Sequence, residues 1–445
     1  MDERFYFQSD SSFDDPYTIN GSLEGWRNEV ARYAVGNSRL AFAISAGFAG
    51  PLLLPTDSES GGFHLRGGSS VGKSTVLTAA GSSWGGRDFI RTWRATSNGL
   101  ESVAALHNDG LLCLDELSQV DSREAGQIAY LIANGVGKTR AGRSGEARKA
   151  LRWRTLFLST GEIDLATKIA EDGRGRRVAA GQEARLVDLP ADAGAGLGIF
   201  EDLHGLASAA DLAQHLKAAA ARHHGHAAPA FIRFLTRDFG GIGPLVAEHQ
   251  REFLTEALPE GADGQVRRVA GRFALVAAAG EMVTSFGILP WPQGEATKAC
   301  RRCLADWIAQ RGGVEPAEDR EAVSAVRRFI QGHGSSRFEP MGDLVHHDST
   351  GTPIDVRIQN RAGFRRRRGN GGTEFLVLPE VWKTEICQGM DSMRVAKVLA
   401  EHGLLKTDGQ GKFQTLHRVL GSSGPIRCYA LLPGILGDEG EGDGS

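Results

Sequence analysis

The chain has 445 residues and a mass of 47.6 kDa, which is enough for two or three domains. Its 51 Lys and Arg residues nearly balance its 54 Asp and Glu residues, which excludes a uniformly basic nucleic-acid-binding protein. The polar start, MDERFYFQSD, and the short apolar stretches predict neither a signal peptide nor a membrane span. Five scattered cysteines favour the cytoplasm over a disulfide-linked fold.

Composition and periodicity divide the chain into four parts. A helical pattern runs from Leu23 to Phe48, and short apolar strands then alternate with helices, as in an α/β sheet domain. The next region is rich in Ala and Leu at helical spacing. In the C-terminal part, the basic run from Phe364 to Arg368 is expected on a loop. The predicted parts are an N-terminal helical segment (1–60), an α/β core (61–190), a helical region (191–312) and a mixed C-terminal domain with an acidic tail (313–445).

A phosphate-binding loop is the strongest motif, in the stretch GGFHLRGGSSVGKSTVLTAA. A short strand is predicted before the loop and a helix after it, so that backbone N–H groups and the helix dipole face phosphate oxygens. Lys73 is expected to reach the β- and γ-phosphates of ATP, and the Ser74 hydroxyl to ligate Mg²⁺. The predicted ATP-binding residues are Gly67, Gly68, Ser69, Ser70, Val71, Gly72, Lys73, Ser74 and Thr75.

A second apolar strand, LLCLDEL, ends in the adjacent carboxylates of Asp115 and Glu116. Asp115 is expected to complete the Mg²⁺ site. Glu116 is expected to polarise the water that attacks the γ-phosphate in line. Paired acids at the end of a strand are common, but after a phosphate loop they favour ATP hydrolysis over a kinase reaction.

A third strand is predicted in LRWRTLFLSTGE, with polar residues at its tip. If this strand lies beside LLCLDEL, then Thr160, or Ser159 next to it, reaches the γ-phosphate or the attacking water. An ordinary strand followed by a turn is the alternative interpretation.

The segment between the second and third strands, Val136 to Arg154, is strongly basic. It carries seven Lys and Arg residues and one acid, Glu146. Gly142 to Gly145 can form the tip of a hairpin. The segment is either a solvated basic loop or a hairpin that follows the phosphates of a nucleic acid.

The order of these motifs resembles that of AAA+ ATPases with a hairpin before the sensor strand, including superfamily 3 and minichromosome-maintenance helicases. The segments NSRLAFAISAGFAGPLL, RTWRATSNGLESVAALHNDGLLCLDEL, ANGVGKTRA and AGQEARLVDLPAD, with the phosphate loop and LFLSTGE, are more closely similar to a helicase-like family of bacterial mobile genetic elements. That family was first catalogued as a domain of unknown function and includes the replicative helicases of cassette chromosomes. The resemblance covers about residues 20–310.

The resemblance implies an α/β fold with a three-layer P-loop core, a hairpin before sensor 1, a helical lid and a winged-helix-like C-terminal domain. It also implies a homo-oligomeric ring, a hexamer, with single-stranded DNA in its channel. The phosphate loop is then the Walker A motif, and Asp115 with Glu116 is the Walker B motif. Thr160 takes the sensor-1 position, where related helicases usually have Asn.

The remaining roles that the resemblance implies fall on basic residues, each of which is alternatively a surface ion-pair partner. Channel-facing, DNA-binding residues would come from the hairpin. One arginine would complete a neighbouring subunit's ATP site, and another would face nucleotide from the lid. The candidates are Lys138, Arg140 and Arg143 for DNA, Arg185 or Arg177 for the neighbouring site, and Arg268 or Arg272 for the lid.

The C-terminal part predicts a helix, a turn, a second helix (Ser392 to His402) and a hairpin around Asp408-Gly409. That is the layout of a winged helix. Arg394, Lys397, Lys406 and Lys412 are candidates for DNA phosphate contacts, although a winged helix that packs only against protein is equally compatible.

These patterns together predict an ATP-driven, ring-shaped DNA translocase, most simply a replicative helicase of a mobile genetic element. Two alternatives stay open. One is an AAA+ ATPase that remodels protein–DNA complexes in defence or element maintenance. The other is a DNA-binding initiator that is gated by nucleotide and has no motor action.

Overall fold

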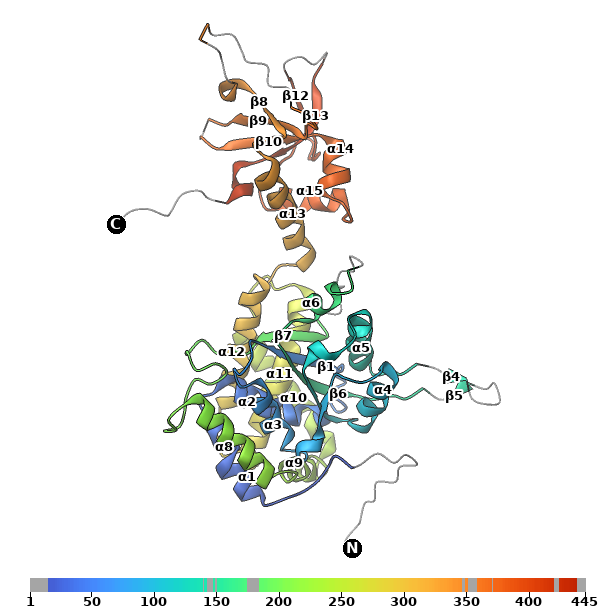
Figure 1. Ribbon diagram of the computed structural model, residues 1–445, viewed down its shortest axis with the longest axis vertical. Coiled ribbons are helices and arrows are strands. Elements are labelled where there is room, and N and C mark those ends of the chain that lie inside the picture. Colours follow the sequence, from blue (N-terminus) through green and yellow to red (C-terminus); the bar gives the residue numbers. More distant parts are fainter. Residues whose placement is uncertain are drawn as a thin grey trace. The chain divides into compact units, whose positions relative to one another are not determined.

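The computed structural model describes residues 15–138, 140–141, 147–148, 150–173, 184–345, 349–350, 358–369, 371–419 and 424–437 (Figure 1). The chain forms two compact units, Met1–Val314 and Glu315–Ser445. This division is coarser than the four predicted parts, which stay a prediction. No helix among these residues is long and apolar enough to cross a membrane.

The first unit is built on a sheet of five parallel strands in the order β2-β3-β6-β1-β7. The mixed α/β fold with a parallel central sheet is therefore confirmed. Because the strands are parallel, their carboxyl ends share one edge of the sheet. The strands are β1 (Gly61–Arg66), β2 (Ile90–Thr92), β3 (Gly110–Asp115), β6 (Thr155–Gly161) and β7 (Leu186–Pro190).

Helices cover both faces of this sheet. Alternate residues of β3 enter different cores: Leu111 and Cys113 pack into the larger core, and Leu112 and Leu114 into the smaller one. A strand buried on both faces reads as a continuous apolar run, which is why LLCL signals it clearly. The larger core includes α1 (Leu23–Glu29), α2 (Ser38–Ala49), α3 (Lys73–Gly81), α8 (Ala209–Arg222), α9 (Ala227–Leu235), α10 (Phe239–Ala257), α11 (Gly264–Ser285) and α12 (Glu295–Arg311), and the smaller core includes α4 (Ser97–Leu106), α5 (Ser122–Asn134) and α6 (Leu165–Ala170).

The predicted helical stretch from Leu23 to Phe48 is not one helix. A 3-10 turn (Ala31–Ala34) follows α1, and α2 begins only at Ser38. Gly36 adopts a left-handed conformation with φ of 77°. The Asn37 side chain accepts hydrogen bonds from two backbone N–H groups of residues 201 and 202. This tertiary anchor fixes the break, which the helical spacing does not reveal.

The second unit begins with α13 (Ala317–His333) and contains a sheet in the order β11-β13-β10-β9-β8, with β12 also paired to β13. Its core stacks Trp382 on Tyr429 at 4.4 Å between ring centroids. The winged-helix assignment stays a prediction. The other elements are β8 (Phe338–Pro340), β9 (Gly363–Arg367), β10 (Thr373–Val377), α14 (Pro379–Val381), a π-helical turn (Trp382–Ile386), α15 (Ser392–Glu401), β11 (Leu405–Lys406), β12 (Thr415–His417) and β13 (Ile426–Leu431).

The loop predicted for the basic run from Phe364 to Arg368 is wrong. Phe364 to Arg367 belong to strand β9, which pairs with β8 and β10. Phe364 is buried, and Arg366 on the same face donates to Glu374 Oε2 at 2.6 Å. Glu374 is 1% exposed, so this cross-strand ion pair lets an arginine point toward the packed face.

The hairpin predicted around Asp408-Gly409 is also wrong in its pairing. A tight turn is present, since the Asp408 N–H donates to the Lys412 carbonyl at 2.9 Å. However, the flanking strands β11 and β12 both pair with β13 rather than with each other. Two of the predicted DNA contacts have acidic partners: Arg394 pairs with Asp319, and Lys397 with Glu401.

Two buried histidines predict a stability that falls in acid. Burial lowers the pKa of both His64 and His107 to about 4, from 6.5. Between these values the unfolded chain binds more protons than the folded chain. Stability is therefore full above about pH 6.5 and is lost as the pH falls toward 4, by about 3 kcal/mol for each histidine.

Urea unfolding of the first unit at pH 7.5 and at pH 5 measures this loss. His107→Phe removes one of the two titrating groups from a site where Tyr17 and Phe89 already contact the ring. We expect the variant to show a smaller decrease between the two pH values. Equal stability of the wild-type protein at pH 5 and pH 7.5 would contradict the assignment.

Candidate functional site

The phosphate loop, residues 67–72, joins β1 to α3 at the carboxyl edge of the sheet. Gly72 has a φ of 103°, and a Cβ added there would lie 2.5 Å from Ile199 Cγ2. Only glycine fits this position, because both the backbone conformation and the space exclude a side chain. Ser70 is also left-handed, with a φ of 63°. Residues other than glycine adopt this conformation rarely, and the rare cases cluster at functional sites.

The Lys73 side chain is folded back into the loop. It is 8% exposed, and its Nζ donates to the carbonyl oxygens of Gly67 at 2.8 Å and Gly68 at 2.6 Å. These two contacts hold the ammonium group at the mouth of the loop. A phosphate group bound to the loop's N–H groups would contact the Lys73 ammonium directly.

Asp115 ends β3 directly opposite the start of α3. The Ser74 hydroxyl lies 3.4 Å from Asp115 Oδ1, and the Thr160 hydroxyl donates to the same oxygen. Thr160 Oγ1 also accepts from the Glu116 N–H at 3.3 Å. Ser74 and Asp115 together offer the few hard oxygen ligands that Mg²⁺ takes from proteins when phosphates and water supply the others. The residues present therefore fit a magnesium ion.

Glu116 lies one residue beyond the end of β3 and has a left-handed backbone, with φ of 61° and ψ of 80°. Its Oε1 accepts from the Ser118 hydroxyl at 2.6 Å, which fixes the carboxylate. Such a conformation costs about 1–3 kcal/mol at a residue other than glycine. Glu116 lines the cavity beside the phosphate loop.

The two polar residues at the tip of β6 point in opposite directions. Thr160 faces Asp115, whereas Ser159 is buried against His64 and Trp93. His64 Nε2 lies 3.0 Å from the Ile163 carbonyl, which can only accept, so Nδ1 accepts from the Ser159 hydroxyl. Burial keeps His64 neutral at physiological pH. Of the two candidates, Thr160 is therefore the one near the acid pair.

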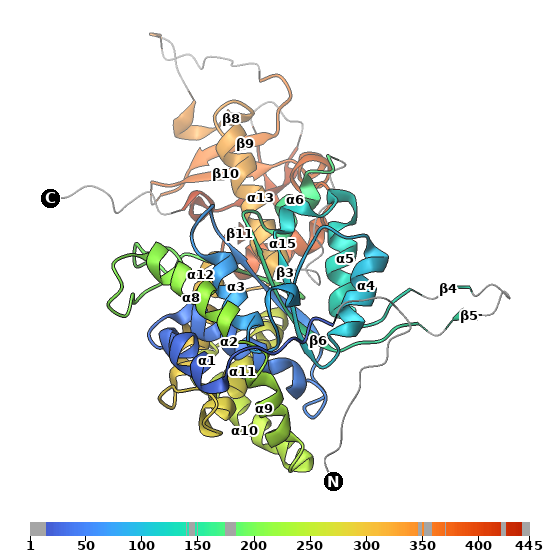
Figure 2. The same ribbon diagram turned by 60° about the horizontal axis from the view of Figure 1, so that its bottom comes forward.

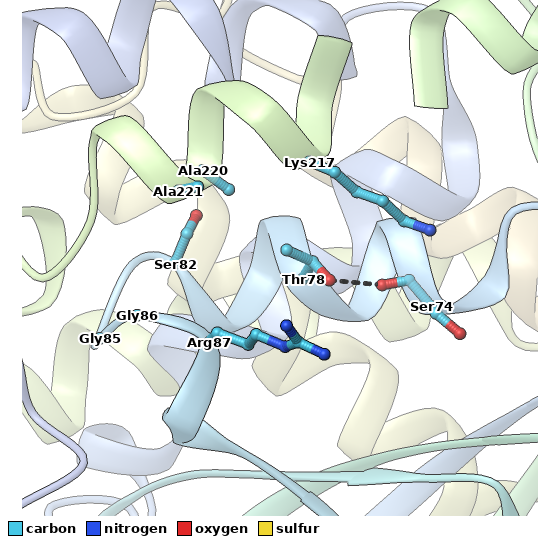
Figure 3. Close-up of a pocket in the computed structure, with 9 residues that line it drawn as sticks. All are labelled: Ser74, Thr78, Ser82, Gly85, Gly86, Arg87, Lys217, Ala220 and Ala221. Carbon is cyan, nitrogen blue, oxygen red and sulfur yellow. Dashed lines mark hydrogen bonds between the residues drawn. The ribbon is translucent and has the colours of Figure 1, made fainter. Parts of the chain in front are cut away.

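A cavity of about 550 Å³ lies over the loop and reaches Glu116 of the acid pair. One of its walls is α8, which the sequence did not associate with the site. Lys217 on that helix also lines a neighbouring cavity of about 360 Å³ between α3 and α8 (Figure 3). The larger cavity is lined by Ser69, Ser70, Gly72, Lys73, Ser74, Thr75, Glu116, Glu162, Ala210, Ala213, Gln214 and Lys217.

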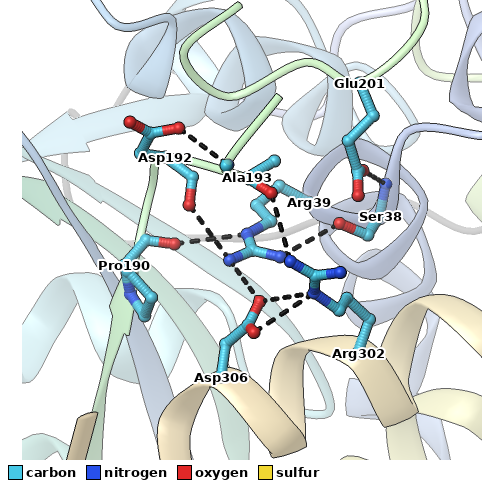
Figure 4. Close-up of polar contacts among 9 residues, drawn as sticks. Ser38, Arg39, Pro190, Asp192, Ala193, Glu201, Arg302 and Asp306 are labelled. Carbon is cyan, nitrogen blue, oxygen red and sulfur yellow. Dashed lines mark hydrogen bonds and ion pairs between the residues drawn. The ribbon is translucent and has the colours of Figure 1, made fainter. Parts of the chain in front are cut away.

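A buried ion-pair network supports the loop from the side of β7 (Figure 4). Arg39 of α2 is 2% exposed and donates to the carbonyls of Pro190 and Asp192, each at 3.2 Å. It also pairs at 2.6 Å with Asp306 of α12, which in turn pairs with Arg302. The segment held in this way follows β7, and its next residues contact the phosphate loop. No local pattern in the sequence indicates this network.

Arg272 does not face the phosphate loop, so its predicted lid role is wrong. The side chain is buried beside Gly61, at the start of β1, and donates to the Ala184 carbonyl at 2.8 Å. Burial lowers the pKa of Arg272 to about 10. Its part of α11 packs at the amino edge of the sheet, whereas the loop follows the carboxyl edge. Arg268 is exposed nearby and contributes to that lowered pKa.

Arg185 also lies at the amino edge of the sheet. Its carbonyl accepts from the Gly62 N–H at 2.8 Å, and its guanidinium stacks 4.5 Å from the centroid of the Tyr130 ring. Arg185 therefore cannot reach the phosphate loop of its own chain. Its role stays a prediction. Arg177 lies outside the described residues.

The basic segment contains an antiparallel pair, β4 (Arg140–Ala141) and β5 (Ala147–Arg148), which lies outside the packed core (Figures 1 and 2). At its base the Lys138 N–H lies 3.4 Å from a carboxylate oxygen of the buried Glu101. The Lys138 side chain is exposed, and its Nζ donates to Ser97 at 3.4 Å. Arg143 and the side chain of Arg140 are outside the described part of the chain.

Comparisons with known proteins agree with this arrangement. A family model, described as a domain of unknown function (DUF927), matches residues 2–152, which include the phosphate loop and the acid pair. A solved structure described as "SCCmec type IV Cch - active helicase" matches with a TM-score of 0.68 and 19% identity, over 97% of this chain and 75% of that chain. No curated protein matches in sequence. The chain thus has a helicase-like fold, and that part of the predicted resemblance is confirmed.

Proposed function

We propose that this protein is an ATP-driven DNA helicase of the AAA+ class that serves the replication of a mobile genetic element. The observation that carries the proposal is the meeting of Lys73, Ser74, Asp115, Glu116 and Thr160 at one edge of the sheet. The likeness in fold to a protein described as an active helicase supports it. In this proposal residues 191–312 act as the lid and residues 313–445 as a winged-helix-like domain.

ATP would bind with its phosphates on the loop's N–H groups and against Lys73. Mg²⁺, held by Ser74 and Asp115, would neutralise phosphate charge. Glu116 accepts a proton from water as the water oxygen bonds to the γ-phosphorus. The bond from this phosphorus to the β–γ bridging oxygen breaks, and its electron pair leaves with ADP. Thr160 orients Asp115 through its hydroxyl hydrogen bond.

A ring of identical subunits, which we propose is a hexamer, would give a role to the residues far from the loop. Arg185 lies at the opposite edge of the sheet, so it can contribute only to the ATP site of another subunit. The hairpin that begins at Lys138 would face the channel, where its cations contact the phosphates of single-stranded DNA. Neither Arg185 nor the hairpin therefore needs to lie near the phosphate loop of its own subunit.

ATP turnover with and without single-stranded DNA tests the proposal. We expect the wild-type protein to hydrolyse ATP, and DNA to raise the rate. Lys73→Ala should lose nucleotide binding, because its ammonium is the cation within the loop. DNA-stimulated turnover without unwinding would favour the remodelling ATPase, and slow turnover that ignores DNA would favour the initiator. Absence of any turnover in the wild-type protein would contradict all three ATPase interpretations.

A further inference from the structure

The cavity of about 360 Å³ between α3 and α8, called the groove below, adjoins the cavity over the phosphate loop. Ser74 and Lys217 line both the cavity over the phosphate loop and the groove, so the two spaces adjoin at these residues. The groove is otherwise walled by small residues, including Thr78 and Ala221, with Arg87 at its other side (Figure 3). Lys217 and Arg87 thus border this groove from two sides, and of the two only Lys217 also lines the cavity over the phosphate loop (Figure 3).

Lys217 is held in this place by the packing of its helix. Leu212, Leu216 and Ala220 of α8 are buried in the core, and Ser208 caps the helix by accepting from the Asp211 N–H at 3.2 Å. The Lys217 side chain lies on the face of α8 that borders the loop, and it extends toward Ser74 (Figure 3).

The charge of Lys217 has no acidic partner within the described part of the chain. Other cations of this unit do have one, as Arg39 and Lys168 show. An ammonium group that borders a phosphate cavity and is not neutralised by the protein is suited to bind the ligand's own negative charge.

We propose that Lys217 binds the terminal phosphate of ATP in its own subunit, as a second cation opposite Lys73. The inference rests on the proposed function, because it assumes that ATP occupies the loop. It assigns to α8 the nucleotide-facing cation that the sequence placed on α11. Since ADP lacks the terminal phosphate, Lys217 distinguishes ATP from ADP, whereas Lys73 serves both.

Equilibrium binding of ADP and of the non-hydrolysable analogue with an imido β–γ bridge tests this assignment. Lys217→Met keeps the length of the side chain and removes its charge. We expect it to weaken binding of the analogue by about 10-fold or more and binding of ADP by less than about 2-fold. Lys217→Arg should restore most of the preference for the triphosphate.

Arg87→Met is the matched control, because Arg87 lines the groove but not the cavity over the loop. It should change the preference between the two nucleotides little. If Lys217→Met weakens both nucleotides equally, or behaves like Arg87→Met, the assignment is overturned. If the wild-type protein binds neither nucleotide, the proposed function itself fails. If it binds both, Lys73→Ala should abolish both, which shows that the phosphate loop holds them and that a failure of the Lys217 variants concerns only Lys217.

Discussion

Replacing Glu116 with Gln is expected to slow ATP hydrolysis by about 10²–10⁴-fold while ATP still binds. The amide keeps the shape of the side chain and its contact with Ser118, but it cannot accept the proton of the attacking water. Lys73 and Ser74, which contact the ground state, are unchanged by the substitution. Single-turnover hydrolysis and equilibrium binding of ATP, measured on the same preparation, separate the two effects.

Glu162 provides the matched comparison, because it is the other acid that lines the same cavity. A Glu162→Gln protein removes an equal charge from the end of β6 rather than from the end of β3. Loss of hydrolysis in Glu162→Gln together with a wild-type rate in Glu116→Gln would show that the general base is Glu162. Retained hydrolysis in both variants would refute catalysis by either carboxylate.

Removing Arg185 should have the second large effect, since an arginine supplied by a neighbour can contribute about 10³–10⁵ in rate. Arg185→Ala subunits are expected to be inactive alone. They should regain activity when mixed with Lys73→Ala subunits, because the two defects lie on different sides of each shared site. Arg185 lies at the amino edge of the sheet, away from the phosphate loop of its own chain, so in this proposal its loss affects the site of a neighbouring subunit.

The steady-state ATPase rate of mixed and unmixed proteins measures the rescue. Arg123→Ala is a suitable control, because Arg123 is exposed and pairs with Asp121, two residues before it. It should neither inactivate the protein nor be needed for rescue. If the mixture of Arg185→Ala and Lys73→Ala assembles but stays inactive, the role belongs to Arg177 or the sites are not shared.

The parts of the site that sequence could predict are those encoded by consecutive residues. The phosphate loop and β3 are recognisable because glycine spacing and an apolar run that ends in acids are local signals. The choice between Ser159 and Thr160 needed the structure, since only the side-chain direction on β6 places one beside Asp115. The assignment of Arg272 failed because helical spacing does not show which edge of the sheet a helix turn approaches.

The parts that could not be predicted depend on contacts between distant segments. Lys217 looks like any lysine on an amphipathic helix until α8 is packed against α3. The pairing of Arg39 with Asp306 joins α2 to α12, which are separated in sequence by most of the first unit. In β9 the consecutive arginines hide the alternation of a strand, so the buried partner Glu374 was needed to recognise it.

Displacement of a labelled strand from a forked DNA duplex tests the central claim most directly. The wild-type protein should displace the strand with ATP and not with ADP. The double variant Lys138→Ala with Arg140→Ala should lose displacement but keep its basal ATP turnover, because the hairpin lies outside the packed core and away from the phosphate loop. Its single-strand affinity should also depend less on salt, by about 0.7 in the log–log slope for each lost phosphate contact. ATP turnover that is stimulated by DNA without any strand displacement in the wild-type protein would contradict the helicase assignment.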